Sequence, residues 1–119
     1  MFNQVVLVGR LTQTPELIQE GEGKNKRTRV ILAVQRAFKS RGKDEYETDF
    51  IPITMWEGIA ESVASYCKKG NPLIVKGRIE ENTYIDKESG KKVYSLNIVG
   101  EKVVFLGSYP KDDRQEEDA

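Results

Sequence analysis

The chain has 119 residues, a length typical of one domain with a single hydrophobic core. Its 19 basic and 19 acidic residues cancel, but two basic and five acidic residues fall within residues 111–119, which leaves 17 basic and 14 acidic residues in the first 110. One cysteine excludes an internal disulfide, and no apolar run is long enough for a membrane span or a secretory signal. We therefore expect a soluble, cytoplasmic protein with a mildly cationic body.

The first strand is predicted at residues 3–11, where residues 5–8 form an unbroken apolar run (VVLV). A strand that is apolar on both faces is typically covered on both faces, and in so small a domain a second subunit could supply one cover. A polar loop is predicted at residues 13–26. A second strand follows at residues 27–38, with Val30, Leu32 and Val34 on one face and the residues from Arg29 to Gln35 that alternate with them on the other.

The third strand, predicted at residues 48–56, has an unusual second face. Its residues 51, 53 and 55 (Ile, Ile, Met) point toward a core, whereas Phe50, Pro52, Thr54 and Trp56 point the other way. This second face is either covered by another part of the protein or left open for a flat ligand. The charged residues 39–47 join it to the second strand as a long, projecting hairpin loop, and we expect Tyr46 and Tyr94 to be packing residues.

One helix is predicted at residues 58–69, with Lys68 and Lys69 in its last turn before Gly70 and with Cys67 packed as a small apolar group. A fourth strand follows at residues 72–81, with a bend or bulge at Gly77. A second projecting hairpin spans residues 84–94. The chain then alternates again until Gly100 interrupts it, and a last strand covers residues 103–106.

This order is strand, strand, strand, helix, strand, strand. It is the order of the oligonucleotide/oligosaccharide-binding (OB) fold, a five-stranded Greek-key barrel, and we predict an all-β domain with one helix and projecting hairpins over residues 1–108. Residues 109–119 contain Tyr109, Pro110, charges and no aliphatic residue before Ala119, so we expect a short, acidic, disordered tail there.

Catalytic chemistry finds little support in these residue types. The chain has no histidine, and one cysteine cannot build a zinc site, so we expect no metal, no cofactor and no enzyme activity. The prominent groups are instead aromatic residues with basic neighbours. Bases can stack on such rings while phosphates meet the cations, which is how proteins hold single strands without reading sequence. The four candidate rings are Phe38, Phe50, Trp56 and Tyr84.

Four segments of the chain resemble the bacterial and phage single-stranded-DNA-binding proteins: residues 3–11 (NQVVLVGRL), 32–38 (LAVQRAF), 49–70 (DFIPITMWEGIAESVASYCKKG) and 75–84 (VKGRIEENTY). The resemblance covers residues 1–106. It implies base stacking on the same four rings, and protection of single-stranded DNA at the nucleoid during replication, recombination and repair. Phosphate contacts are expected from basic residues near the rings or on the family pattern: Arg10, Arg36, Lys39, Arg41, Lys68, Lys69, Arg78, Lys91 and Lys92.

The resemblance also implies a homotetramer in which the first strand pairs between subunits. The predicted interface residues are Asn3, Val5, Leu7 and Gly9. Long family members end in an acidic tip closed by an apolar residue that docks partner enzymes. Residues 116–119 (EEDA) keep the charge without that apolar tip, which argues against recruitment of replication enzymes and favours a short accessory or phage-type member.

Two alternatives remain open on the same fold. A replication or primosome adaptor would act mainly through protein contacts, but it would not need four spaced stacking rings. An RNA-binding module would use the same rings, which do not distinguish RNA from DNA.

Overall fold

The computed structural model describes residues 1–19, 21, 25–39 and 41–106, and the predicted tail at 109–119 lies outside them. Within this part of the chain, no helix is long and apolar enough to cross a membrane. The elements in chain order are β1 (Val5–Leu11), β2 (Ile18–Gln19), β3 (Lys26–Lys39), β4 (Tyr46–Trp56), α1 (Glu57–Tyr66), β5 (Pro72–Ile85) and β6 (Lys92–Phe105).

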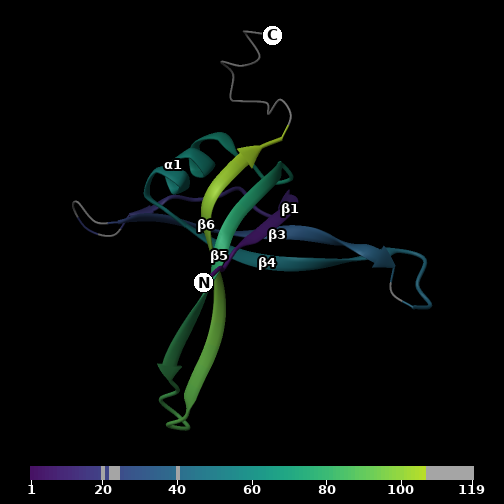
Figure 1. Ribbon diagram of the computed structural model, residues 1–119. Helices are drawn as coiled ribbons and strands as arrows, with labels where there is room; N and C mark the ends of the chain where they lie inside the picture. The colour runs from purple at the N-terminus through teal and green to yellow at the C-terminus, as the bar shows by residue number, and fades with distance from the viewer. Residues whose placement is uncertain (20, 22–24, 40, 107–119) are drawn as a thin grey trace.

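Five strands close into a barrel in the order β1-β5-β6-β4-β3, and a pairing of β1 with β3 completes the circle. The β4–β6 pairing is parallel, and every other pairing in the sheet is antiparallel. The helix α1 lies between β4 and β5 in the chain, and the β3–β4 and β5–β6 hairpins project away from the barrel in two directions (Figure 1). The predicted OB fold with one helix and projecting hairpins is therefore confirmed.

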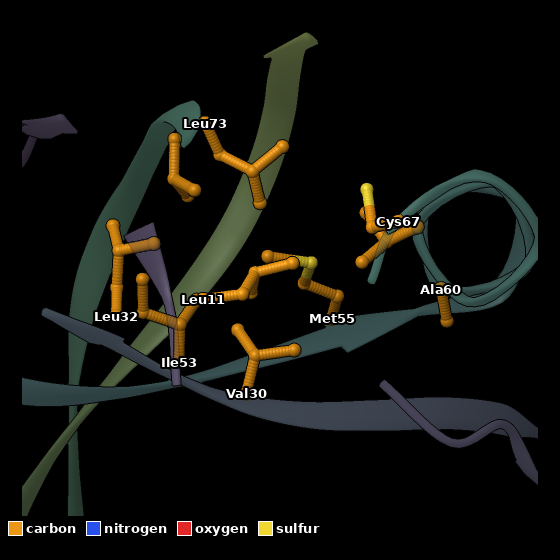
Figure 2. Packing of buried hydrophobic residues seen from close by; sticks show 10 residues of the cluster. Leu11, Val30, Leu32, Ile53, Met55, Ala60, Cys67 and Leu73 are labelled. Carbon is orange, nitrogen blue, oxygen red and sulfur yellow. The ribbon is translucent and has the colours of Figure 1, made fainter. Parts of the chain in front are cut away.

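The core lies inside the barrel and is built from alternate residues of the strands, as Figure 2 shows. Val30 and Leu32 of β3 and Ile53 and Met55 of β4 are buried, which confirms the inward faces predicted for both strands. Thr28 is buried beside them, and its hydroxyl donates a hydrogen bond to the carbonyl of Glu16 at 2.7 Å. The remaining buried members come from β1, α1, the residue after it and β5: Leu11, Ala60, Val63, Cys67, Leu73 and Val75.

Two predictions about the strands are wrong. The segment predicted as a loop at 13–26 contains the short strand β2, which pairs with Lys26 and Arg27 of β3. Gly100 does not end a strand, because β6 continues through it. The β5–β6 ladder shifts by one residue there, since Lys76 pairs with Lys102 and Gly77 with Gly100. The predicted irregularity at Gly77 is thus a β-bulge that absorbs Glu101 without breaking either strand.

The helix ends earlier than predicted. Its last backbone bond runs from the Cys67 N–H to the Val63 carbonyl, and Cys67 itself is extended. The next amides bond outside the helix, because Lys68 N–H donates to Asn71 Oδ1 and Gly70 N–H donates to the Leu11 carbonyl. Lys68 and Lys69 therefore lie in an exposed turn after α1 and not in its last turn.

Cys67 packs as a small apolar group, as predicted, and burial raises the pKa of its thiol to about 11. Since a free thiol titrates at about 8.5, the contribution of Cys67 to the unfolding free energy should be constant below that pH and fall as the pH rises from about 8.5 to about 11. Urea unfolding across this range measures the fall, and Cys67→Ala should remove it. Rapid alkylation of the native thiol by iodoacetamide at neutral pH would contradict its burial.

Candidate nucleic-acid interface

The outer face of β3–β4 presents two rings, with Pro52 and Thr54 between them on β4 and Ile31 and Arg29 beside these on β3. The register pairs Arg27 with Trp56, Arg29 with Thr54, Ile31 with Pro52 and Ala33 with Phe50. Ala33 has only a methyl group to place beside the Phe50 ring, and that ring is 65% exposed. Trp56, at the other end of the face, is 40% exposed. Of the two possibilities for this face, the structure favours the open one for the described residues.

Pro52 lies within this face without disturbing the ladder. The β3–β4 register is continuous from Arg27 to Gln35, and β4 pairs with β6 only from Ile53 onward. Pro52 therefore lies where the second edge of β4 has no partner strand, which is the position that a residue without an N–H tolerates. The irregularity in the ladder lies instead between Gln35 and Lys39.

The other two rings lie on the projecting hairpins. Phe38 is 81% exposed in the irregular part of β3, and Tyr84 is 57% exposed near the end of β5. Tyr84 pairs with Val93 and not with a lysine, because Lys92 pairs with Ile85 and so lies on the opposite face of the hairpin. Lys91 is exposed in the connecting turn.

The packing roles predicted for Tyr46 and Tyr94 are wrong. Tyr94 is 64% exposed, and its partner is Thr83, so its ring lies on the face opposite Tyr84. Tyr46 is exposed too, and Lys39 Nζ lies 5.5 Å from the centre of its ring in a cation–π contact. Alternation could not decide these positions, because both faces of a projecting hairpin lie outside the barrel core.

Two of the predicted basic residues are held by carboxylates. Arg36 donates from Nε and Nη2 to the two oxygens of Asp49 at 3.0 and 2.9 Å, and from Nη1 to Glu47 at 2.7 Å. The hydrogen bonds from Arg36 lower the pKa of Asp49 below its usual value. Glu47 also accepts a hydrogen bond from Lys43 at 2.6 Å. Arg36 is thus part of a chain of alternating charges across the β3–β4 hairpin.

Arg78 is held in the same way. Its guanidinium forms ion pairs with Glu80 on its own strand and with Glu101 on β6, the latter at 3.2 Å. A phosphate would have to compete with two carboxylates at Arg36 and at Arg78, so neither is well placed for the predicted DNA contact.

Arg10, another predicted cation, lies in the same cross-strand row as Phe50 and against the turn that contains Lys68 and Lys69. Arg10 Nη1 donates to the Gly70 carbonyl at 3.0 Å, which brings β1 against the turn that contains Lys68 and Lys69. Arg10 also pairs with Ala33, which in turn pairs with Phe50, so Arg10 and Phe50 share one row across three strands. The exposed Lys39 and Arg41 lie instead near the tip of the β3–β4 hairpin.

The predicted interface residues Val5, Leu7 and Gly9 all lie on one face of β1, the less exposed one. The side chains of Val5 and Leu7 are half-buried, whereas Val6 and Val8 are exposed. Gly9 lies so close to β3 that a Cβ there would be 2.3 Å from the Ala33 carbonyl oxygen. The run is therefore apolar on both faces as predicted, but its exposed apolar side chains are those of Val6 and Val8.

The side chain of Asn3 forms hydrogen bonds with the backbone of β5 in the same chain. Its Nδ2 donates to the Ile79 carbonyl at 2.7 Å, and its Oδ1 accepts from the Ile79 N–H at 3.0 Å. Val5 pairs with Gly77, so a backbone continuing β1 in the same register would bond next to Ile79. The side-chain amide of Asn3 makes those two hydrogen bonds instead.

A family model described as "Single-strand binding protein family" matches residues 2–106. The chain belongs to this family. It is 40% identical over 112 residues to single-stranded DNA-binding protein B of Bacillus subtilis, which covers 94% of this chain and 96% of that protein. It is also 40% identical over 105 residues to single-stranded DNA-binding protein 1 of Clostridium acetobutylicum, covering 88% of this chain and 94% of that one. A third relative, single-stranded DNA-binding protein 3 of the same organism, is 46% identical over 106 residues, which cover 88% of this chain and 71% of that protein.

Arg29 was not among the basic residues predicted from the sequence to contact DNA. Alternation placed Arg29 on the outer face of its strand, but its relation to Trp56 depends on the β3–β4 register, which pairs it with Thr54. Counting from the hairpin would not have supplied that register, because the register shifts between Gln35 and Lys39 and the Lys39–Tyr46 pairing alone would set Arg29 opposite Trp56.

Proposed function

We propose that this chain binds single-stranded DNA without sequence preference, by stacking bases on Phe38, Phe50, Trp56 and Tyr84. The observation that best supports this proposal is the outer face of β3–β4, where two exposed rings lie on either side of Pro52 and Thr54. Stacking contributes about 1 to 3 kcal/mol per base, and every base has a face that can stack. Duplex DNA keeps its base faces inside the helix and cannot use such rings.

The biological role that follows is protection of single strands during replication, recombination and repair, in the cytoplasm at the nucleoid. Membership of the single-strand binding protein family supports this role. Residues 1–108 would form the binding domain. We do not propose that residues 109–119 recruit enzymes.

The protein should act as a homotetramer assembled through β1. Two observations support this: Val6 and Val8 are exposed on β1, and within the described residues β1 pairs with β3 only at Arg10 and Leu11, which leaves one edge of Val5 to Gly9 open. Light scattering should give about four times the chain mass of 13.5 kDa. A monomer mass at micromolar concentration would exclude this assembly.

Fluorescence of Trp56, the one tryptophan in the sequence, tests the function. A thymidine oligomer should quench it, because a base stacked on the indole changes its surroundings, whereas a duplex of equal length should leave it nearly unchanged. A uridine oligomer of the same length tests the RNA-binding alternative. Absence of quenching by single-stranded DNA, with the protein folded by circular dichroism, would refute the proposal.

A further inference from the structure

Arg29 lies on the outer face of β3–β4 between the two rings of that face. Its direct partner is Thr54, and Trp56 is two residues further along the same face of β4. Diagonal neighbours of this kind in an antiparallel pair are about 7 to 8 Å apart at the backbone, within reach of a long side chain. A strand stacked on Trp56 and running toward Phe50 would therefore pass over Arg29.

The surroundings of Arg29 differ from those of Arg36 and Arg78. Its side chain is exposed, and it forms no hydrogen bond or ion pair within the part of the chain that the structure describes. Arg36 and Arg78 are each bound by two carboxylates. Among these three arginines, Arg29 alone can meet a phosphate without first releasing an anionic partner, which avoids the cost of breaking an ion pair.

A cavity of about 180 Å³ adjoins Arg29 on the side away from Thr54. It contains polar groups from the segment after β1, including Gln13 and the hydroxyl of Thr14. That hydroxyl accepts a hydrogen bond from the Lys69 N–H at 3.0 Å, so the turn that contains Lys69 lies beside the same cavity. Glu16 also lines the cavity, and its carboxylate would repel a phosphate inside it, which leaves Arg29 and not the cavity as the candidate anion-binding group.

We propose that Arg29 binds a backbone phosphate of the strand that stacks on Trp56 and Phe50. This inference rests on the proposed function and adds to it a phosphate contact outside the cations chosen from the sequence. A planar guanidinium with free donors can bind two oxygens of one phosphate, which also fixes the strand relative to the rings. The contact is made to the backbone, so it is the same for every base sequence.

Arg29→Gln tests the proposal through the salt dependence of binding. Binding of a thymidine oligomer is measured by Trp56 quenching over a series of salt concentrations for the wild-type protein and the variant. Loss of one phosphate contact should lower the slope of log K against log[salt] by about 0.7, and affinity at low salt should fall by about threefold to tenfold. The amplitude of quenching at saturation should not change, because Trp56 remains in place.

Two variants serve as controls. Arg29→Lys keeps the charge and should preserve most of the slope, and Arg78→Gln removes an arginine already bound by Glu80 and Glu101 and should leave the slope nearly unchanged. An unchanged slope in Arg29→Gln, with wild-type quenching intact, would overturn the role of Arg29 and leave the proposed function standing. Absence of quenching in the wild-type protein would instead refute the function itself.

Discussion

Replacing both Phe50 and Trp56 with alanine should lower the affinity for a thymidine oligomer by between about 30-fold and about 10⁴-fold. Each ring contributes about 1 to 3 kcal/mol by stacking, and their losses should nearly add, because the two rings are separate contacts along β4. The fold should survive, since both side chains are exposed and the core contains neither. Because the variant lacks tryptophan, binding is measured by the anisotropy of a fluorescent oligomer.

Phe2→Ala is the matched control for this experiment. Phe2 is also an exposed ring, but it precedes β1 and is not one of the four proposed stacking residues. Its removal should change affinity by less than about threefold, the range of a rim contact. Near-wild-type affinity of the Phe50 and Trp56 double variant would mean that the outer face of β3–β4 is not the stacking surface.

A methyl group at Gly77 should produce a large loss of stability, about 3 kcal/mol for Gly77→Ala. A Cβ there would lie 2.1 Å from the carbonyl oxygen of Val99, a backbone atom of the paired strand that no side-chain rotation can move. β5 and β6 would have to separate at the bulge, where their ladder closes one side of the barrel. Urea unfolding followed by circular dichroism measures the change in unfolding free energy.

Gly100→Ala provides the comparison on the opposite strand. Its Cβ would meet the Met55 side chain at 3.0 Å, and methionine can adapt by rotating about its flexible bonds. We expect a smaller loss, about 1 kcal/mol. Equal losses for the two variants would show that the crowding at the Val99 carbonyl is not what requires glycine at Gly77.

The barrel and the faces of its strands could be predicted from sequence because both depend on local patterns. A period of two assigns each side chain of β4 to one face, so the burial of Ile53 and the exposure of Phe50 follow from their positions alone. Glycine and proline mark where strands bend or lack a partner, as Gly77 and Pro52 do, although the type of irregularity at each required the register.

The availability of the cations could not be predicted, because it depends on pairs that are distant in sequence. Arg36 and Asp49 are 13 residues apart, and Arg78 and Glu101 are 23 apart. Which carboxylate a long side chain reaches is decided by strand register and by the irregularities within each ladder. The end of α1 was missed for a similar reason, since the amide of Gly70 bonds to Leu11, far earlier in the chain.

The amide of Asn3, which occupies the place of a ladder residue beside Ile79, also protects an edge of the sheet. Before the first residue of β1, Val5, the backbone of β5 would otherwise present an unpaired N–H and C=O to any extended chain nearby. Both groups of Ile79 are already bonded, so a foreign strand that added to β5 there would have to displace two hydrogen bonds for the two it formed. The Asn3 side chain thus disfavours edge-to-edge aggregation at the base of the exposed β5–β6 hairpin.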